Sequence, residues 1–463
     1  MRLGHVEERI RSKMTLRGID PGAIESFVRM VGQMRNDTSA HVSLYALESP
    51  DSRTILESPS DPLEMKNLEE RGRELLSRVA VIKLNGGRST NMGGHTPKGT
   101  ILAKDGRCYL EIIINQVAAL REKWQVDVPL VLMNSFFTDS PTMEILRRFE
   151  LPVLTFIQQQ VPRLVEETLM PLDTGTEEDW APPGHGDVYD SLQRTGTLSR
   201  LKRLGCKWAF ISNLDNLAAY PEPWILGLME RDNIEFLLEV TDRTPVDRKG
   251  GTLVIREGRL DLLELAQVAP EEGDSFMDIN RFRVFNTNNV WIDLEALSTA
   301  LTNDALKLPI ICNCKNIDGA RVIQLETAMG AAIGSFRRSR GLRVLRDRFF
   351  PTKKVADLFL LQSDACVLDS MFRLRKNPSR PDSLSFMPTV LFDPDFLDHP
   401  EDISKRFEAA SSVSLVRANS LQVKGRAFFE REVIIQGSVE IEVPDGQEYR
   451  IPSGTVLRDG RYP

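Results

Sequence analysis

Short apolar runs alternate with amphipathic stretches between about residue 78 and residue 380. The runs predicted as buried strands are 128–133, 153–157, 208–212 and 235–240. The segments with helical spacing between them are 110–124 and 142–149. Strands that alternate with helices in this way favour a mostly parallel sheet covered on both faces.

The two ends of the chain have different patterns. Residues 1–75 are polar and predicted to be helical, with the clearest helical spacing at 23–31 and 64–81. The tail carries short β-like pieces at 421–425, 433–443 and 451–457, punctuated by glycines. Such repeated short pieces predict stacked coils, a small left-handed β-helix. A few coils bury little surface alone, so we expect them to dock on the main domain or on a neighbouring chain.

A cluster of prolines between residues 377 and 402 indicates where the tail begins. We therefore expect an N-terminal helical segment (1–75), an α/β domain with a mixed, mostly parallel sheet (76–385) and a C-terminal β-helix domain (386–463). A chain of 463 residues is long enough for such a division.

Charge and composition exclude some partners. The formal net charge is -7, so we expect neither a nucleic acid nor an anionic membrane as main partner. No apolar stretch approaches the roughly 20 residues of a membrane span, and the charged start of the chain does not resemble a secretory signal. The odd, scattered set of five cysteines predicts reduced thiols that serve in packing, and a cytoplasmic location. Cys312 and Cys314 are too close together for a Cys-x-x-Cys motif.

The stretch VIKLNGGRSTNMGGHTPKG, residues 81–99, carries the strongest chemical signal. A strand that ends in Gly86-Gly87 delivers a tight loop with free backbone N–H groups to the carboxyl edge of a sheet. Lys98 adds a positive charge, so the segment is suited to hold nucleotide phosphates. The spacing fits neither the Walker nor the dinucleotide-binding pattern. A glycine-rich surface loop is the alternative interpretation.

This loop resembles the nucleotide-binding loop of UTP–glucose-1-phosphate uridylyltransferases of the eukaryotic type, which usually has the sequence LNGGLGTxMG followed by GPK. Further blocks match that family in its own order, from about residue 60 to the end of the chain. They are VLMNSF (131–136), FIQQQVPR (156–163), PPGHGDVY (182–189), SNLDNL (212–217), TDRTPVDRKGGTL (241–253), ELAQV (264–268), FNTNNVW (285–291), VIQLETAMGAAI (322–333) and RDRFFPTKK (346–354).

The resemblance implies a Rossmann-like domain with a C-terminal β-helix and a Mg²⁺-dependent, reversible reaction. In it UTP and glucose 1-phosphate give UDP-glucose and pyrophosphate, as the sugar phosphate attacks the α-phosphorus in line. Such chemistry depends on alignment and on neutralised charge more than on a protein nucleophile. The family also leaves room for a homo-oligomer that pairs through its β-helix tails.

The resemblance implies roles for single residues of the nucleotide site. Lys98 would hold triphosphate oxygens. The predicted nucleotide-binding residues are Leu84, Asn85, Gly86, Gly87, Met133, Gln158 and Gly184, with the Gln158 amide and the Gly184 backbone reading the uracil.

Other residues would serve the sugar phosphate and the transfer. His185 would donate to the sugar phosphate, with Asn213 beside the substrate. Asp215 would hold either Mg²⁺, which often takes a single carboxylate, or the ribose. Lys353 would neutralise charge on the α-phosphate during transfer. The competing assignment is the neighbouring Lys354.

Three further residues, Gly250, Glu264 and Asn288, are implied as glucose contacts. Side chains of these polar types also bond the local backbone, so a purely structural role is the alternative for each.

The loop departs from the family pattern at two adjacent positions. Arg88-Ser89 stands where the family usually has Leu-Gly, and Gly94-His95-Thr96 also differs. Ser89 lacks the freedom of glycine at positive φ, and Arg88 adds a cation. Two other functions therefore compete with the first: an enzyme for another sugar 1-phosphate such as galactose 1-phosphate, and a nucleotide-sugar-binding regulator without turnover.

Overall fold

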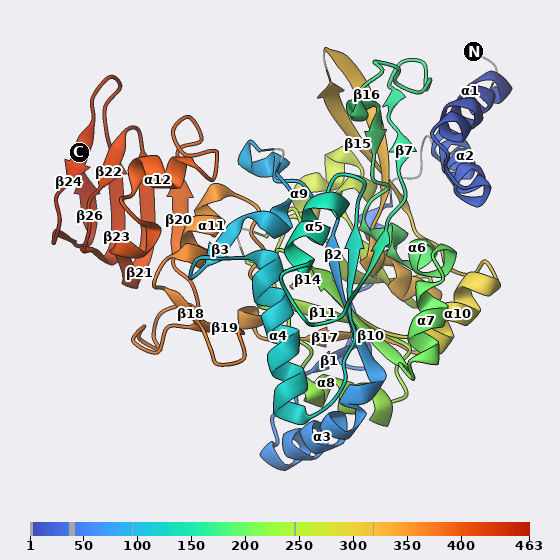
Figure 1. Cartoon of the computed structure of the whole chain (residues 1–463), viewed down its shortest axis with the longest axis horizontal. Helices are drawn as coiled ribbons and strands as arrows, with labels where there is room; N and C mark the ends of the chain where they lie inside the picture. The colour runs from blue at the N-terminus through green and yellow to red at the C-terminus, as the bar shows by residue number, and fades with distance from the viewer. Residues whose placement is uncertain (1–2, 37–41, 95, 245–246, 318) are drawn as a thin grey trace.

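The computed structural model describes residues 3–36, 42–94, 96–244, 247–317 and 319–463. His95 of the departing loop, and Pro245-Val246 of the block at 241–253, lie outside the described residues. Figure 1 shows a central sheet flanked by helices, the N-terminal helices at one edge and the C-terminal strands at the other.

The central sheet has eight strands. Their order across the sheet is β1 (Ile55–Glu57), β17 (Ser339–Arg343), β11 (Phe236–Asp242), β14 (Val284–Asp293), β10 (Trp208–Asn213), β2 (Val79–Asn85), β5 (Leu130–Asn134) and β6 (Val153–Ile157). β14 is antiparallel to β11 and β10, while the other neighbouring strands pair in parallel. The predicted mixed, mostly parallel sheet is confirmed.

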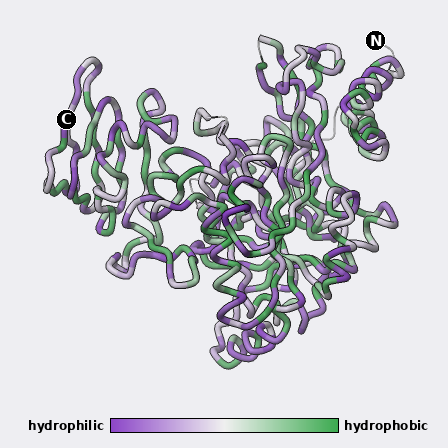
Figure 2. Tube along the Cα trace, in the orientation of Figure 1, coloured by the Kyte–Doolittle hydropathy of each residue, from purple (hydrophilic) through white to green (hydrophobic). Residues whose placement is uncertain are grey.

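Strand β2 lies inside the sheet, between β10 and β5, and its first four residues are apolar on both faces. Val79 and Val81 pack into one hydrophobic cluster with the helices α4 (Tyr109–Trp124) and α8 (Pro223–Arg231). Ala80 and Ile82 point to the other cluster, which includes α6 (Val188–Arg194), α7 (Thr197–Arg203) and α10 (Leu294–Thr302). Alternate residues of a strand face opposite sides, so one apolar run fills two cores. Hydrophobic colour accordingly concentrates in the central strands (Figure 2).

Smaller elements complete the catalytic region. The helices are α3 (Pro62–Leu75), α5 (Asp139–Leu146), α9 (Gly273–Phe276) and α11 (Val355–Gln362). The strands are β3 (Leu102–Lys104), β4 (Arg107–Cys108), β7 (Val161–Pro162), β8 (Leu164–Val165), β9 (Trp180–Ala181), β12 (Thr252–Arg256), β13 (Arg259–Leu263), β15 (Ile310–Ile317), β16 (Ala320–Thr327), β18 (Cys366–Leu368) and β19 (Leu374–Lys376).

Several sequence predictions need correction. The helix predicted at 64–81 ends at Leu75, and β2 begins at Val79 after one short 3₁₀ turn, because the β-branched run is buried between β10 and β5. The helix predicted at 142–149 begins earlier, at Asp139, and ends at Leu146. The segment 1–75 is not wholly helical, since β1 pairs with β17 of the central sheet.

The N-terminal helices α1 (Leu3–Leu16) and α2 (Pro21–Asn36) share a hydrophobic cluster with Val161, Trp180 and Leu325. At its rim, Lys13 pairs with Asp179 at 2.8 Å and Arg17 pairs with Glu177 at 2.6 Å. The hairpin therefore holds the segment that contains three consecutive acidic residues.

The tail is built from parallel strands. One sheet contains β20 (Thr389–Phe392), β21 (Val413–Lys424), β23 (Val433–Glu442), β25 (Val456–Leu457) and β26 (Gly460–Tyr462); a second pairs β22 (Ala427–Phe429) with β24 (Tyr449–Ile451). The short helix α12 (Asp402–Arg406) lies between β20 and β21 in the chain. Phe407 lies 4.3 Å from Phe359 of α11, ring centre to ring centre, and stacks on Phe429. The tail thus docks on the main domain, as expected.

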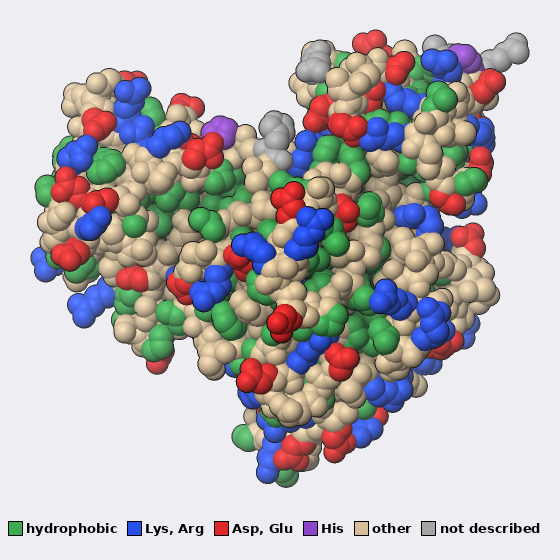
Figure 3. Space-filling view, viewed as in Figure 1, with side chains coloured by type: hydrophobic (Ala, Val, Ile, Leu, Met, Phe, Trp, Pro, Cys, Tyr) green, Lys and Arg blue, Asp and Glu red, His purple; other side chains and the backbone are tan. Residues whose placement is uncertain are grey.

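All five cysteines are free thiols, as predicted, but Cys312 and Cys314 are exposed on β15 rather than packed. Their strand lies at the edge of a small sheet, which leaves one face open. Within the described residues no helix is long and apolar enough to cross a membrane. Acidic and basic side chains are interspersed over the face seen in Figure 3.

Candidate active site

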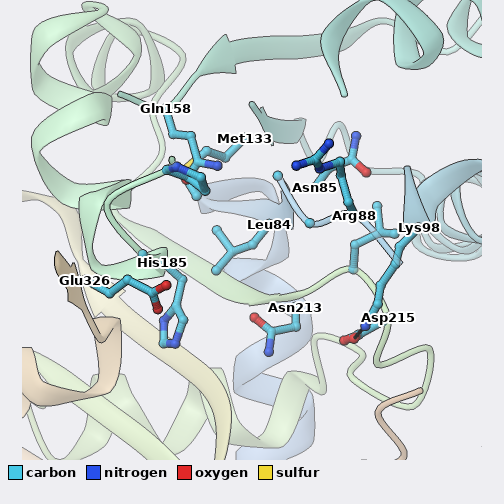
Figure 4. Close-up of a pocket in the computed structure, with 15 residues that line it drawn as sticks. Leu84, Asn85, Arg88, Lys98, Met133, Gln158, His185, Asn213, Asp215 and Glu326 are labelled. Atoms are coloured by element: carbon cyan, nitrogen blue, oxygen red, sulfur yellow. Dashed lines mark hydrogen bonds and ion pairs between the residues drawn. The ribbon is translucent and has the colours of Figure 1, made fainter. Parts of the chain in front are cut away.

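A pocket lies at the carboxyl ends of β2, β5 and β10, where ligands of parallel α/β sheets bind. It has a cavity volume of about 240 Å³. Its walls contain the predicted residues Leu84, Asn85, Gly86, Gly87, Lys98, Met133, Gln158, Gly184, His185, Asn213 and Asp215. Figure 4 shows Gln158 and Met133 at one end, Lys98 and Asp215 at another, and His185 opposite the glycine loop. The fold therefore brings together residues that lie far apart in the sequence.

The glycine loop is a closed turn. The Lys98 N–H donates to the Gly87 carbonyl at 3.2 Å, and the Ser89 N–H donates to the Thr96 carbonyl at 3.0 Å. Arg88 and Pro97 form an isolated antiparallel bridge between the two arms. Ser89 has φ of −79°, an ordinary value for serine, so the loss of glycine at this position causes no backbone strain.

Gly86 lies against the end of the Gln158 side chain. A Cβ at residue 86 would lie 2.2 Å from Gln158 Nε2, whereas a Cβ at residue 87 would have no heavy atom within 4 Å. Gln158 is buried, and its own N–H donates to the Asn134 carbonyl at 2.8 Å. The absence of a side chain at Gly86 thus sets the position of the amide predicted to read uracil.

We expect Gly86→Ala to weaken UDP-glucose binding by about tenfold or more, because the new methyl group displaces the Gln158 amide. Gly87→Ala is the matched control, since its methyl group leaves Gln158 in place. Titration calorimetry on both variants provides the measurement. Equal affinities for the two variants would contradict the role of Gln158.

The imidazole of His185 has a defined donor atom. The Met329 N–H donates to His185 Nδ1 at 3.1 Å, so the neutral ring carries its proton on Nε2. Gly184 precedes it at φ of 84°, and a Cβ at this position would lie 2.5 Å from the Thr327 carbonyl oxygen. Burial, and then the nearby charge of Lys353, lower the pKa of His185 from 6.5 to about 4. At neutral pH the ring is therefore a neutral Nε2–H donor.

Because the pKa of His185 falls to about 4 on folding, only the unfolded chain takes up this proton between pH 6.5 and pH 4. The contribution of the group to the free energy of unfolding is full above pH 6.5 and is lost as the pH falls toward 4. We expect the NMR signal of the His185 ring, assigned with a His185→Gln variant, to stay constant from about pH 8 to about pH 5.5. A midpoint near its ordinary pKa would contradict the buried, neutral ring.

Asp215 and Lys98 form an ion pair at the end of β10. Lys98 Nζ lies 2.7 Å from Asp215 Oδ2 and donates to the Thr352 carbonyl at 2.9 Å. The other carboxylate oxygen, Oδ1, is buried without a hydrogen-bond partner. Within the described residues no cluster of three or more His, Cys, Asp or Glu side chains is placed to hold a metal. A single carboxylate with an unused oxygen fits Mg²⁺ that takes its remaining ligands from phosphates and water.

The loop that carries Lys353 is attached to the Asp215 loop. The Thr352 N–H donates to the Asp215 carbonyl at 3.3 Å, and the Phe350 N–H donates to Asn216 Oδ1 at 2.9 Å. The charge of Lys353 lowers the pKa of His185 and opposes the rise in the pKa of Glu264, while both Lys353 and Lys354 favour the charged form of Asp357. Both lysines are exposed and neither lines the pocket, so only this difference in charge effects favours Lys353.

The three predicted glucose contacts, Gly250, Glu264 and Asn288, are not among the residues that line the pocket. Burial raises the pKa of Glu264 to about 7, with Lys353 and Arg243 opposing the rise, so Glu264 lies within the field of Lys353. A Cβ on Gly250 would collide with the Phe285 ring at 2.0 Å. Asn288 has φ of 56° and accepts from Asn286 Nδ2 at 3.0 Å. Glu264 therefore interacts electrostatically with Lys353 of the predicted site. Gly250 and Asn288 show local structural constraints.

Sequence reasoning missed some residues of the site. Pro182, Leu214 and Glu326 line the pocket, and all three fall within the matching blocks, which was the available signal. Lys83 was missed as well. It is buried beneath the pocket, its Nζ donates to Ser212 Oγ and to the Ala219 carbonyl at 2.8 Å each, and burial lowers its pKa to about 7. The available signal was the position of Lys83 within an otherwise apolar strand, which predicts a buried hydrogen-bond donor.

A mostly parallel α/β sheet whose pocket combines a glycine loop, Lys98 and a lone carboxylate, with Lys353 on an attached loop, is typical of a nucleotidyltransferase. The family model described as UTP–glucose-1-phosphate uridylyltransferase matches residues 24–436. The chain therefore belongs to the UTP–glucose-1-phosphate uridylyltransferase family.

Individual relatives agree over nearly the whole chain. The UTP–glucose-1-phosphate uridylyltransferase of Solanum tuberosum is 37% identical, with 93% of this chain and 90% of the relative covered. That of Encephalitozoon cuniculi is 35% identical, with 96% and 90% covered. The solved structure of a Leu-to-Asp mutant of UDP-glucose pyrophosphorylase from Leishmania major in complex with UDP-glucose has a TM-score of 0.87 at 32% identity, with 100% of this chain and 99% of that chain covered.

Proposed function

We propose that this protein transfers the uridylyl group of UTP to glucose 1-phosphate, reversibly. A phosphate oxygen of glucose 1-phosphate forms a bond to the α-phosphorus of UTP, the bond from that phosphorus to the bridging oxygen breaks, and pyrophosphate leaves with the bonding electron pair. The products are UDP-glucose and pyrophosphate. This reaction needs no nucleophile from the protein, and the pocket supplies amides, lysines and one carboxylate instead.

One observation carries the proposal: a single pocket contains a fixed amide, a neutral histidine donor and a lysine–carboxylate pair, each held by the fold. Gln158, with the Gly184 backbone and Met133, reads the uracil. His185 Nε2–H and Asn213 hold the sugar phosphate. Lys98 binds triphosphate oxygens, and Lys353 neutralises the charge that develops on the α-phosphate. The Leishmania relative that was solved with UDP-glucose supports this nucleotide sugar as the product.

Mg²⁺ fits the free oxygen of Asp215, with phosphate oxygens and water as its further ligands. When bound, the ion neutralises phosphate charge and aligns the leaving group. Asp215 would have to share its carboxylate between Lys98 and the ion, because its other oxygen already accepts from Lys98.

Sugar selection would rest on Glu264, and on Gly250 and Asn288, the other two residues that the resemblance implies as glucose contacts. The carboxyl group of Glu264, whose pKa is about 7, can accept from or donate to a sugar hydroxyl. A preference for galactose 1-phosphate is the second candidate, since that sugar differs only at the C4 hydroxyl.

Pyrophosphate release after mixing the protein with UTP, Mg²⁺ and glucose 1-phosphate tests the proposal. Parallel samples contain galactose 1-phosphate in place of the glucose ester, or TTP in place of UTP. We expect rapid release only with UTP and glucose 1-phosphate. Faster release with galactose 1-phosphate would favour the sister activity. No release with any pair, together with measurable UDP-glucose binding, would identify a regulator without turnover.

We further propose that the parallel sheets of the tail are coils of a left-handed β-helix, residues 386–463, which pairs two copies of the chain. The parallel pairings β21–β23 and β22–β24 support the coils. Five free thiols support a reducing compartment, the cytoplasm. Light scattering that gives the monomer mass at every concentration would exclude the pairing.

A further inference from the structure

Arg88 occupies a position inside the nucleotide pocket rather than in solvent. Its side chain is only 15% exposed, and it lines the same cavity as Lys98. The bridge between Arg88 and Pro97 joins the backbones of the two loop arms, and the side chains of Arg88 and Lys98 lie on the same side of the pocket (Figure 4). The family pattern has leucine at this position, so this positive charge is a feature of this chain's loop.

Two contacts hold the guanidinium group in the free protein. Arg88 Nη2 donates to Glu178 Oε1 at 3.1 Å, and the guanidinium carbon lies 3.8 Å from the centre of the Phe137 ring. Glu178 also accepts from Arg163 Nη1 at 3.2 Å. Because Arg163 continues to compensate Glu178, Arg88 can leave this carboxylate for another anion without stranding a buried charge.

The geometry of the transfer indicates which anion Arg88 would bind in place of Glu178. In an in-line reaction the attacking group and the leaving group lie on opposite sides of the α-phosphorus. His185, which holds the attacking sugar phosphate, lies across the pocket from Arg88 and Lys98 (Figure 4). The leaving pyrophosphate therefore lies on the side of the two cations. A guanidinium fork binds two phosphate oxygens at once, which an ammonium cannot do.

We propose that Arg88 binds the β- and γ-phosphates of UTP, which leave together as pyrophosphate. On substrate binding its guanidinium exchanges the Glu178 carboxylate for these phosphates. The inference rests on the proposed function, because it assigns the pyrophosphate side of that same pocket.

The test separates the two products by calorimetry, which requires no turnover. Pyrophosphate with Mg²⁺ and UDP-glucose are titrated separately into the wild-type protein and into Arg88→Leu, which carries the usual family residue. We expect pyrophosphate to bind about tenfold more weakly or worse to the variant, because charge-assisted hydrogen bonds are lost. UDP-glucose, which lacks the β- and γ-phosphates of UTP, is expected to bind within about twofold of wild type.

Two further variants exclude a purely structural role. Arg88→Lys keeps the charge and should lose only part of the pyrophosphate affinity. Glu178→Gln weakens the resting contact and should leave pyrophosphate affinity equal to that of wild type or higher. Three outcomes would overturn the inference. Arg88→Leu could weaken the binding of both ligands equally, or leave pyrophosphate binding unchanged. Glu178→Gln could weaken pyrophosphate binding. A wild-type protein that binds both ligands but never turns over would refute the proposed function alone.

Discussion

Replacing Lys353 by alanine is expected to lower the turnover number by about 10²–10³-fold, while UDP-glucose still binds. The reason is that this ammonium group meets its full partner only in the transition state, when charge builds on the α-phosphate. In the free protein its charge lowers the pKa of His185 and opposes the rise in the pKa of Glu264, which favours a place near the reacting groups. Steady-state rates at saturating UTP and glucose 1-phosphate, together with a UDP-glucose binding isotherm, provide the measurement.

Lys354→Ala is the matched control for this experiment. Both lysines are exposed, and both backbone N–H groups donate to Asp357 Oδ2 at 2.8 Å, so the two variants disturb the start of α11 alike. The charges of both lysines act on Asp357, but of the two only that of Lys353 acts on His185 and Glu264. We expect Lys354→Ala to keep nearly normal turnover. Low turnover in Lys354→Ala with normal turnover in Lys353→Ala would assign the catalytic role to Lys354. Normal turnover in both variants would refute a catalytic role for either lysine.

Asp215→Asn is expected to lower the turnover number by a similar factor, about 10²–10³-fold, with little change in thermal stability. An amide has the shape of the carboxylate and can still accept from Lys98 Nζ through its oxygen. It lacks the negative charge that Mg²⁺ requires, and its NH₂ group replaces one of the two oxygens.

A metal-binding measurement, independent of activity, serves as the control for Asp215→Asn. Mn²⁺, added together with UTP and followed by electron paramagnetic resonance, is expected to bind wild type more tightly than the variant. A variant that binds Mn²⁺ and turns over like wild type would show that Asp215 serves only as a partner of Lys98.

The strands of the sheet were predictable because each is a short apolar run with a clear end. The run at 153–157 coincides with β6, and that at 208–212 is one residue shorter than β10. Helix ends were harder to place. Helical spacing continues through Leu76–Arg78 into Val79–Val81, and only pairing with β10 and β5 decides that the chain turns there. Tertiary contacts of this kind leave no mark on the local pattern.

The part of the candidate site that could be predicted from the sequence is the part that lies within short motifs. The glycine loop, Lys98 and the residues that follow strands were placed together as predicted. The sequence could not show that Lys98 rests on Asp215, or that Arg88 turns inward onto Phe137. Those contacts join segments 117 residues and about 50 residues apart, and they depend on how the loops pack. The assignment of Gly250 and Asn288 to the glucose stays a prediction, since the structure shows only local constraints at both positions.

A crystal structure with bound UDP-glucose would test the central claim most directly, that uridylyl transfer takes place in the pocket between the glycine loop and His185. We predict the imide edge of uracil against the Gln158 amide, the diphosphate within reach of His185 Nε2 and Lys353, and the glucose toward Glu264. UDP-glucose in any other cavity, or a uracil whose imide edge faces away from Gln158, would contradict the account.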